Sequence, residues 1–301
     1  MSRPLSTALA SDLPAASVVV ELLKPITWFP PMWAFACGVV SQPSMPAHRW
    51  PAILAGVVLC GPLLCATSQA VNDWFDREVD AINEPTRPIP SGRMPGRWGL
   101  YVAVLWSFLS MACAAALGPW VLGAAALGMA LAWLYSAPPV RLKQNGWWGN
   151  LACAACYEGL AWITGAVVAG GGAPSVKILE VAALYSLGAH GIMTLNDFKS
   201  TEGDRRLEIA SLPVRLGAER AGEVACVTMA LAQLVVVALL TAWGEPRPAF
   251  AVAALLGAQL LLMRRLLVDP RARAPWYNGT GVSLYVIGML ISAFALRSVA
   301  P

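Results

Sequence analysis

The sequence has little charge and almost no histidine. Only 13% of its 301 residues are Asp, Glu, Lys or Arg, and the two histidines are His48 and His190. Soluble domains carry about 25% charged residues, so this composition excludes an ordinary soluble protein. The chain also offers no Ser-His-Asp or Cys-His constellation that would indicate nucleophilic catalysis.

Several features of exported or nucleic-acid-binding proteins are also absent. All seven cysteines lie within apolar segments, which predicts no disulfide framework, and the pair Cys153 and Cys156 is more typical of helix packing than of a redox or zinc site. Residues 1–16 lack the order of regions found in a signal peptide, so we expect a retained, mobile segment. No long Pro/Gly/Ser linker and no dense basic run occur. We therefore expect one transmembrane domain over residues 1–301 and no nucleic-acid partner.

Long apolar segments dominate the chain instead. Hydrophobic residues make up 57% of it, and the mean hydropathy is +0.60. Segments of about 18 to 24 residues cross a hydrocarbon layer of about 30 Å as helices, which satisfy their own backbone in lipid. The sequence predicts an all-α, polytopic membrane bundle in the lipid bilayer. The nine expected helices lie at about 20–41, 51–71, 98–117, 119–136, 147–169, 177–196, 221–243, 248–267 and 277–298.

Basic residues lie mostly on one side of these segments. If the N-terminus is cytoplasmic, 17 of the 21 Lys and Arg residues fall on the cytoplasmic side. Cytoplasmic loops of membrane proteins carry an excess of Lys and Arg, and this asymmetry sets the orientation. We therefore expect the N-terminus and the long loops near 79–97, 137–146 and 199–220 to be cytoplasmic and the C-terminus to be periplasmic or luminal.

An acidic nine-residue pattern occurs twice, and both copies fall on the expected cytoplasmic side. Residues 72–80 read NDWFDREVD and residues 196–204 read NDFKSTEGD. At about 100° per residue, Asp73, Asp76 and Asp80 form one helical stripe with Asn72 at its edge, so they can converge on one point. Carboxylate and amide oxygens are the ligands that Mg2+ prefers, and its remaining ligands are commonly waters and substrate phosphate.

The second copy supplies a similar set of oxygens. Asn196, Asp197 and Asp204 occupy the matching positions, Ser200 replaces the middle aspartate, and Glu202 is a nearby substitute. Two such motifs offer enough donors to hold two Mg2+ against a diphosphate. Solvated loop charges are the simpler explanation for any single acid or base, but they do not explain an in-phase repeat. Basic residues that could bind the phosphates are Arg77, Arg87, Arg93, Arg141, Lys143, Lys199, Arg205 and Arg206.

These motifs carry a family resemblance. NDWFDREVD is similar to the NDxxDxxxD signature of the UbiA superfamily of intramembrane prenyltransferases, and NDFKSTEGD resembles its second acidic motif. The extension DAINEPTRPIPSG, the segment YSAPPVRLKQNGWWGN and the segment NDFKSTEGDRRLEIASLPVRLG resemble the chlorophyll and bacteriochlorophyll synthase branch. The start LKPITWFPPMWA and the later segment APWYNGTG are more similar to the bacterial, bacteriochlorophyll side of that branch.

The resemblance implies an activity, its substrates and its site. The expected reaction esterifies the propionate of bacteriochlorophyllide a with geranylgeranyl or phytyl diphosphate, with Mg2+ as cofactor, in a cavity open to the cytoplasmic side. It implies a bacterial inner or intracytoplasmic photosynthetic membrane, with other pigment-synthesis or assembly proteins as possible partners. The residues implied to hold Mg2+ and diphosphate are Asn72, Asp73, Asp76, Asp80, Asn196, Asp197 and Asp204, with Arg87, Arg141 and Lys143 on phosphate oxygens. Whether Ser200 leaves a second metal incompletely ligated stays open.

Some assignments have alternatives. His190, about six residues before the second motif, could face the pigment or ligate its central magnesium, and a hydrogen-bonded packing histidine is the alternative. Tryptophans such as Trp147 and Trp148 could flank a tetrapyrrole or anchor the membrane interface. Chlorophyll synthase is the alternative within the branch, followed by an aromatic prenyltransferase of quinone synthesis. An ion-coupled transporter or a noncatalytic pigment carrier is the alternative from another class.

Overall fold

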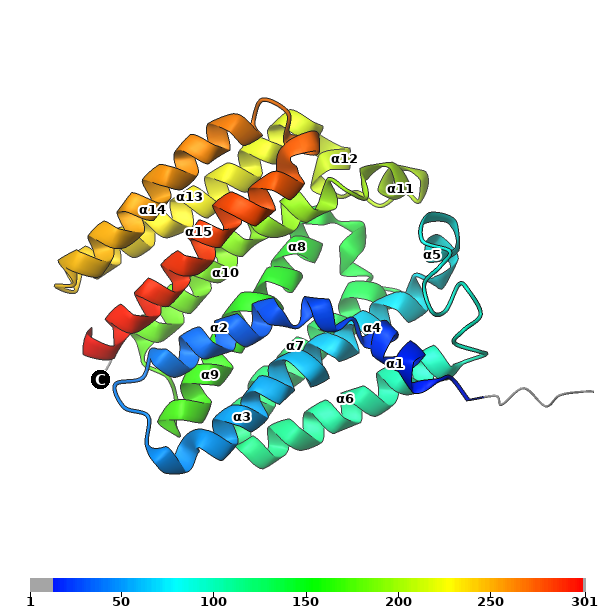
Figure 1. Cartoon of the computed structure of the whole chain (residues 1–301), viewed down its shortest axis with the longest axis horizontal. Coiled ribbons are helices and arrows are strands. Elements are labelled where there is room, and N and C mark those ends of the chain that lie inside the picture. Colours follow the sequence, from blue (N-terminus) through cyan, green and yellow to red (C-terminus); the bar gives the residue numbers. More distant parts are fainter. Residues whose placement is uncertain (1–12, 300–301) are drawn as a thin grey trace, which may run out of the picture.

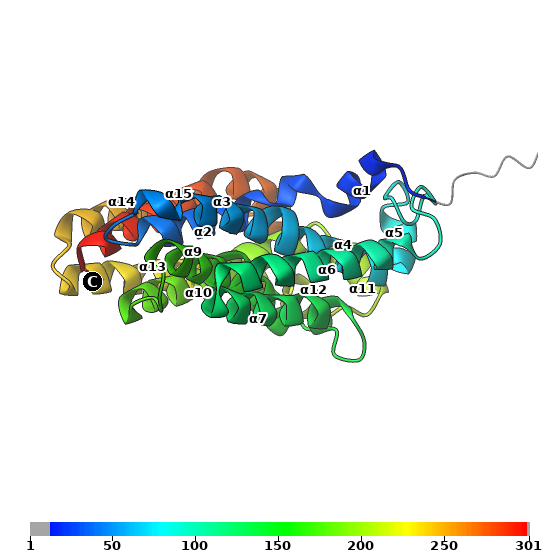
Figure 2. The same cartoon turned by 90° about the horizontal axis from the view of Figure 1, so that it is seen from below.

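The long helices lie side by side and run between two ends of the molecule (Figure 1). A computed structural model describes residues 13–299, so most of the segment 1–16 that was predicted to be mobile lies outside the described residues. Seen from below, the helices stack in layers along the same long direction (Figure 2). The expected all-α membrane bundle is confirmed. All seven cysteines are free.

The helical elements differ widely in length. The bounds are α1 Ala16–Leu23, η1 Pro25–Thr27, α2 Phe29–Val40, η2 Ala47–Arg49, α3 Trp50–Val58, η3 Leu59–Cys65, α4 Ala66–Phe75, α5 Arg77–Asn83, α6 Trp98–Leu117, α7 Pro119–Ser136, η4 Leu142–Gln144, α8 Gly146–Ala154, η5 Ala155–Leu160, α9 Ala161–Gly170, α10 Val176–Asp197, α11 Thr201–Arg206, α12 Leu212–Leu216, α13 Ala218–Ala242, α14 Pro246–Leu266 and α15 Pro270–Val299.

Within residues 13–299, eight continuous helices are long and apolar enough to cross a membrane. The first predicted span, 20–41, differs, because the chain breaks between α1 and α2 and only Phe29–Val40 remains as a shorter apolar helix. The break is local. Lys24 takes a left-handed conformation with φ 48°, and Pro25 cannot donate a backbone hydrogen bond. α1 is thereby separated from α2 and packs beside α4 (Figure 1).

The span that ends in the first acidic motif is a composite helix. Ala47–Phe75 is continuous but widens into a π-helical segment at Leu59–Cys65, which contains Pro62. A proline inside a helix removes one backbone donor, and π-helical turns are rare and occur mostly as short bulges inside α-helices, as here. The carbonyl of Pro62 accepts a hydrogen bond from Trp106 Nε1 at 3.1 Å, which fixes this bulge against α6.

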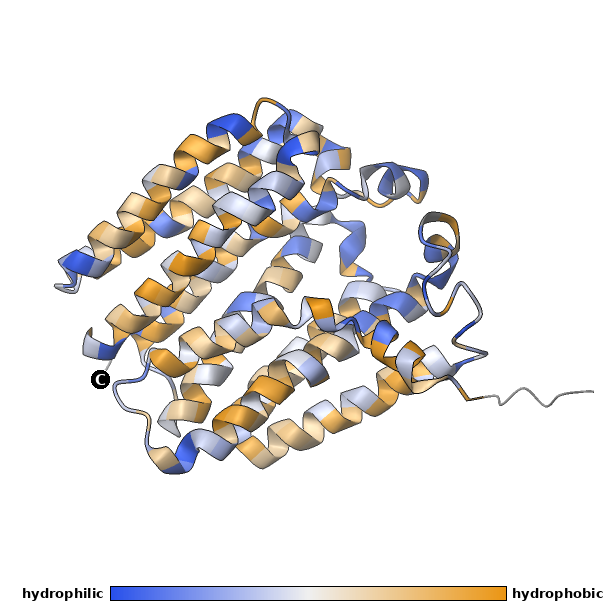
Figure 3. Ribbon diagram, viewed as in Figure 1, coloured by the Kyte–Doolittle hydropathy of each residue, from blue (hydrophilic) through white to orange (hydrophobic). Residues whose placement is uncertain are grey.

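The polar elements gather at one end of the bundle. The short helices α5, α11 and α12 lie in segments predicted as loops, and they share one end with α1 and the α14–α15 turn (Figure 1). Figure 3 shows hydrophilic residues concentrated there and at the opposite turns, with apolar helices between. The last helix begins at Pro270, earlier than the predicted 277. Both acidic motifs therefore lie at the same end, as expected.

Two kinds of contact hold the helices together. α2 and α9 approach closely at glycines, since a Cβ on Gly38 would lie 1.9 Å from the Trp162 carbonyl oxygen and one on Gly165 would lie 2.0 Å from the Phe35 carbonyl oxygen. Small residues permit such packing in membranes, where the hydrophobic effect does not drive helix association. α13 and α14 are joined by a fully buried pair, in which Gln259 Nε2 donates to Gln233 Oε1 at 2.8 Å.

Candidate active site

The first acidic motif spans the junction between α4 and α5. α4 ends at Phe75, and Asp76 has a non-helical backbone with φ −98° and ψ 4°. The backbone hydrogen bonds nevertheless continue across the junction, from Asp76 N to Asn72 O at 2.9 Å and from Asp80 N to Asp76 O at 2.7 Å. The acidic side chains therefore remain near one another even though the helix changes direction.

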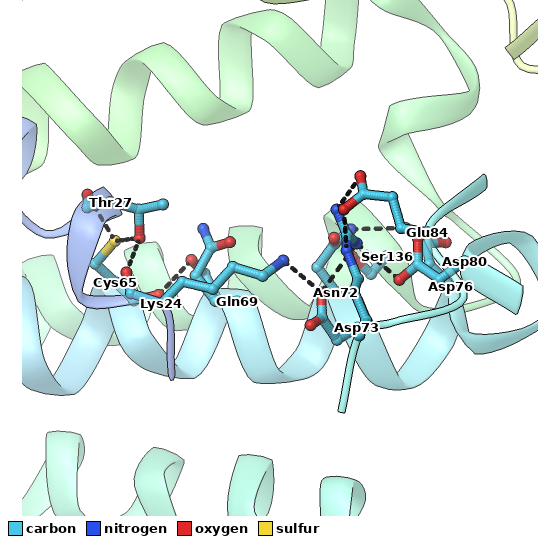
Figure 4. A network of polar contacts seen from close by, with 12 residues as sticks. Lys24, Thr27, Cys65, Gln69, Asn72, Asp73, Asp76, Asp80, Glu84 and Ser136 are labelled. Atoms are coloured by element: carbon cyan, nitrogen blue, oxygen red, sulfur yellow. Dashed lines mark hydrogen bonds and ion pairs between the residues drawn. The ribbon is translucent and has the colours of Figure 1, made fainter. Parts of the chain in front are cut away.

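Each carboxylate of this motif faces a basic group. Asp73 accepts from Lys24 at 2.6 Å and lies 3.4 Å from Arg87, which also donates to Asp80 at 2.7 Å. Figure 4 shows Lys24 reaching along α4 towards Asp73, with Asp76, Asp80 and Glu84 grouped beyond it.

Asp76 has a separate set of partners. Its Oδ1 is paired with Arg141 at 3.2 Å and with the ammonium of Lys143, and its Oδ2 accepts from Asn72 at 2.9 Å.

Two of the three carboxylates, those of Asp73 and Asp80, meet at Arg87, while Asp76 turns to Arg141 and Lys143. Within residues 13–299, no three His, Cys, Asp or Glu side chains are grouped closely enough to hold a metal ion. Like charges on one stripe repel, and each carboxylate lowers its energy by turning to a nearby cation. The site is therefore an ion-pair cluster, formed by Asp73, Asp76 and Asp80 with Lys24, Arg87, Arg141 and Lys143.

Burial works against the charged forms of these groups. Burial raises the pKa of Asp80 to about 6, although Arg87 opposes the shift. Burial also lowers the pKa of Lys143, and the adjacent Asp76 counteracts it. Charges in such surroundings interact strongly with an added ion because water screens them less. The cluster is therefore suited to binding a charged ligand.

The second motif lies at the end of α10, opposite the first. Asp197 Oδ2 accepts from Asn150 Nδ2 at 2.9 Å, and Asn196 Oδ1 accepts from Asn278 Nδ2 at 2.9 Å. Ser200 donates to Asp204 at 2.8 Å. The serine at the middle position thus contacts the last aspartate of its own motif.

The segment that carries Lys143 contacts the chain that follows the second motif. Burial raises the pKa of Asp204, and Lys143 lowers it while Asp76 raises it further. A short backbone contact brings the two loops together, because Gly146 N donates to Ala210 O at 2.9 Å and Ala210 N donates to Gln144 O at 3.1 Å. Lys143, which pairs with Asp76 of the first motif, thus lies on a segment that is joined to the chain after the second motif.

The structure separates the remaining predicted residues from this cluster. Arg77 lies over the Trp74 ring at 4.7 Å, and Arg93 forms an ion pair with Glu21 at 2.5 Å. Lys199 is exposed.

The predicted substitute ligand Glu202 is likewise turned away from the cluster. Its carboxylate is exposed, and it lies 3.2 Å from Arg206 and 4.0 Å from Arg205 on the same helix. These contacts are of the kind expected for solvated charges.

Three polar residues of the site were not predicted. Lys24 was counted only as a topological charge, Ser136 lies 3.3 Å from Asn72 Nδ2, and Asn150 contacts Asp197. In the sequence, Asn150 is a polar residue just after a pair of tryptophans at the start of an apolar helix. A polar residue there costs free energy unless it is hydrogen-bonded, so its presence alone could have indicated a polar partner.

An apolar cavity begins beside the first motif. It has a volume of about 210 Å³ and extends between α4, α7 and the α8–α9 helix. Asn72, Gln69 and Ser68 line its polar end, and side chains such as Leu64, Met129 and Leu160 line the rest. The arrangement can hold a molecule with an anionic head at the ion-pair cluster and a long apolar tail in the membrane interior.

Replacing Asn150 by Leu tests its role in positioning Asp197. The change keeps the approximate size but removes the donor at 2.9 Å, and a hydrogen bond to a charged group contributes about 1.5–3 kcal/mol. We expect any turnover at this site to fall by about 10- to 100-fold. Thr194→Val is the control, since it removes the other partner of Asn150, at 3.3 Å, together with a bond from Thr194 to the His190 carbonyl within α10, and leaves the Asp197 contact in place. Equal effects of the two variants on turnover would contradict a specific role for the Asp197 contact.

Comparisons with known proteins agree with this geometry. The model of the UbiA prenyltransferase family matches residues 27–294. The chain is 57% identical to the bacteriochlorophyll synthase 33 kDa chain of Cereibacter sphaeroides, over 95% of each chain. It is 38% identical to the chloroplastic chlorophyll synthase of Arabidopsis thaliana, over 92% of this chain and 73% of that one. A solved UbiA homolog from Archaeoglobus fulgidus bound to GPP and Mg2+ has the same fold, with a TM-score of 0.70, 21% identity and coverage of 94% and 100%.

Proposed function

The chain belongs to the UbiA prenyltransferase family, and we propose on this basis that it catalyses the bacteriochlorophyll synthase reaction. The enzyme joins the propionate carboxylate of bacteriochlorophyllide a to geranylgeranyl or phytyl diphosphate and releases diphosphate. The observation that supports this choice most directly is the 57% identity, over 95% of both chains, to a bacteriochlorophyll synthase 33 kDa chain, against 38% to a plant chlorophyll synthase.

The donor set suits Mg2+. One oxygen of Asp73, Oδ2, is buried without a hydrogen-bond partner among the described residues, and the same motif adds the carboxylate of Asp76 and the amide of Asn72, which are hydrogen-bonded to each other. Hard cations prefer such oxygens. The residues that would hold Mg2+ are Asn72, Asp73, Asp76, Asp80, Asn196, Asp197 and Asp204. When bound, the metal neutralises negative charge on the diphosphate oxygens.

The basic residues bind and stabilise the leaving group. Lys24, Arg87, Arg141 and Lys143 already lie on the carboxylates of the first motif. Guanidinium and ammonium groups pair strongly with phosphate oxygens, so these side chains can exchange a carboxylate partner for diphosphate. Their charge then stabilises the diphosphate as the allylic C–O bond breaks and the electron pair leaves with oxygen.

No general base is needed for the second half of the reaction. The pigment propionate is ionised at neutral pH and supplies the electron pair for the new C–O bond, so no proton has to be removed. The protein's remaining task is to exclude water, which would otherwise capture the allylic cation. The apolar cavity between α4, α7 and α9 holds the prenyl tail and contributes to this exclusion.

The same proposal includes an orientation. With both acidic motifs at the basic end of the bundle, the active-site loops and the N-terminus face the cytoplasm and the C-terminus faces the periplasm or lumen of a bacterial photosynthetic membrane. A protease added to sealed inside-out vesicles is expected to cut the loop near 199–220, and to leave it intact in right-side-out vesicles.

The direct test uses the purified protein in detergent. Bacteriochlorophyllide a, geranylgeranyl diphosphate and Mg2+ are expected to give esterified pigment, measured by chromatography, and EDTA is expected to abolish the product. If product forms with chlorophyllide but not with bacteriochlorophyllide a, the protein is a prenyltransferase whose pigment substrate is chlorophyllide. Pigment binding without any ester, from either pigment, would instead favour a carrier.

A substitution in the cavity tests where the tail binds. Gly128 lines the cavity on α7, and a leucine there would extend into it from a position where a Cβ meets only Leu160 Cδ1, at 3.6 Å. We expect Gly128→Leu to reduce kcat/KM for the 20-carbon diphosphate by about tenfold or more, because overfilling a packed site costs about 1–3 kcal/mol. The reduction should be smaller for a 10-carbon diphosphate. Gly123→Leu, on the same helix with nothing within 4 Å, is the control and should leave both substrates unaffected. Equal losses with both tail lengths would contradict this tail position.

A further inference from the structure

A glutamine lies in the apolar cavity one helical turn deeper than the first acidic motif. Gln69 and Asn72 are three residues apart on α4, so they share a helix face and lie about 4.5 Å apart along its axis. Both side chains line the cavity, and Figure 4 shows Gln69 between Cys65 and Asn72. Gln69 is therefore placed where the diphosphate of a substrate bound at the ion-pair cluster would be followed by its tail.

The side-chain amide of Gln69 is held through its nitrogen. Nε2 donates to the hydroxyl of Tyr157 at 3.0 Å, and the thiol of Cys65 contacts the same hydroxyl at 3.5 Å. All three side chains line the cavity, and those of Gln69 and Tyr157 are half-buried. Among residues 13–299, no hydrogen bond is formed by Oε1 of Gln69. The amide oxygen is therefore available to a ligand in the cavity.

Gln69 differs in this respect from His190, which was considered as a residue facing the pigment. His190 is 7% exposed, and within residues 13–299 neither of its ring nitrogens forms a hydrogen bond. Both nitrogens are buried, and the ring stacks on that of Trp147 beside a different groove, between α8, α10 and α13. The structure thus supports neither role that was weighed for His190, pigment ligand or hydrogen-bonded packing residue.

The position of Gln69 matches the part of the substrate on which positive charge develops. When the allylic C–O bond breaks, the electron pair leaves with the diphosphate oxygen, and the positive charge is shared between C1 and C3 of the prenyl unit. An amide oxygen carries partial negative charge, and a fixed dipole in apolar surroundings stabilises a nearby cation more than it would in water. A hydrocarbon tail alone would not recover the free-energy cost of an amide in this cavity.

We propose that Gln69 is a catalytic residue whose Oε1 stabilises the allylic cation, and that Tyr157 is a positioning residue that holds the amide in this orientation. The inference rests on the prenyl-transfer step of the proposed function and adds a residue to it. Gln69 forms no covalent bond and transfers no proton. The acceptor carboxylate supplies the electron pair of the new C–O bond, which replaces the pair that left with the diphosphate.

The test compares two ligands of the same shape and different charge. The cationic probe is a saturated analogue of the 20-carbon tail with an ammonium nitrogen in place of C3, and the neutral probe has carbon there. Each probe is titrated, with inorganic diphosphate and Mg2+, into the purified protein in detergent. We expect Gln69→Leu to weaken binding of the cationic probe by about tenfold or more, because it mimics the charge of the transition state. Binding of the neutral probe should change by less than about twofold, and the esterification rate should fall about as much as the cationic probe loses affinity.

Further variants separate an electrostatic role from a structural one. Gln69→Glu keeps an oxygen at this position and should bind the cationic probe within about threefold of the wild-type affinity. Tyr157→Phe releases the amide and should weaken the cationic probe by about threefold, but it should have no further effect in Gln69→Leu, because the two residues act as one unit. Gln42→Leu and Tyr101→Phe are the matched controls and should affect neither probe, since Gln42 lies in the α2–η2 connection and Tyr101 is 52% exposed on α6.

Several outcomes would overturn this inference. Gln69→Leu could weaken both probes equally, which would indicate a structural role, or bind the cationic probe more tightly, which would place Nε2 rather than Oε1 against the cation. A raised KM for the pigment with unchanged affinity for the cationic probe would assign the amide to the acceptor carboxylate instead.

The inference and the proposed function can fail separately. If the wild-type protein forms ester while Gln69→Leu keeps its affinity for the cationic probe, the role of Gln69 is wrong and the proposed function stands. If Gln69→Leu selectively loses that affinity but the wild-type protein esterifies no pigment, the role of Gln69 stands and the proposed function fails.

Discussion

Asp76→Asn is expected to lower the rate of pigment esterification by about 100- to 1000-fold, the range found when one preorganised electrostatic partner is removed from an active site. Asp76 connects more groups of the site than any neighbouring acid, since it pairs with Arg141 and Lys143 and accepts from Asn72. The amide keeps the size of the side chain but loses the negative charge. That charge orients Arg141 and Lys143 and would help to hold Mg2+. Initial rates at saturating Mg2+ and both substrates measure the effect.

Glu78→Gln is the matched control for this prediction. Glu78 lies in the same motif, two residues further on, but its side chain is 87% exposed and its nearest base is Arg77 at 3.6 Å. Removing this charge should change the rate by less than about twofold, because exposed ion pairs contribute little. A similar loss in both variants would indicate that net charge at this end of the bundle matters, rather than the position of Asp76.

Gly165→Val is expected to prevent stable folding or to lower the free energy of unfolding by about 3 kcal/mol or more, beyond the common range for single substitutions. A Cβ at this position would lie 2.0 Å from the Phe35 carbonyl oxygen and 2.9 Å from its carbon. Both are backbone atoms of α2, which cannot move aside as a side chain could. The two helices must separate to admit the valine. Thermal unfolding in detergent, followed by circular dichroism, measures the loss.

Gly257→Val provides the comparison on a helix that lacks this contact. No heavy atom lies within 4 Å of a Cβ at that position on α14. The same chemical change should therefore shift the midpoint of thermal unfolding by only a few degrees. A Gly165→Val protein that unfolds at the wild-type midpoint would refute the close approach of α2 and α9.

The fold was largely predictable because lipid leaves few options for a backbone. Continuous apolar runs have to form helices, so segments such as 98–117 and 119–136 agree with α6 and α7. The break before α2 was not predictable in the same way. Apolar residues continue on both sides of Lys24, and its left-handed backbone accompanies a contact with Asp73, 49 residues away. Hydropathy contains no information about such long-range pairs.

The site was predictable in its composition and less so in its geometry. The repeated motif identified the acidic residues, and the structure brings Asp73, Asp76 and Asp80 near Arg87 and Lys143. Sequence spacing treats a helix as straight, whereas Asp76 interrupts it, and side chains turn to the nearest opposite charge.

Asn150 and Glu202 illustrate the same limit of sequence spacing. Asn150 contacts an acid 47 positions away, while Glu202 lies within the motif yet pairs with Arg206. Proximity in sequence therefore led us to include Glu202, which is turned away from the site, and to miss Asn150, which contacts Asp197.

The glutamine pair between α13 and α14 constrains how the chain enters the bilayer. Gln233 and Gln259 are both completely buried and hydrogen-bonded to each other at 2.8 Å. A helix that left the translocon alone would expose its amide to lipid at a cost, whereas a hairpin of both helices hides the two amides together. The short turn between Ala242 and Pro246 makes that hairpin available as soon as α14 is synthesised. Insertion of this part of the protein is thus expected to proceed two helices at a time.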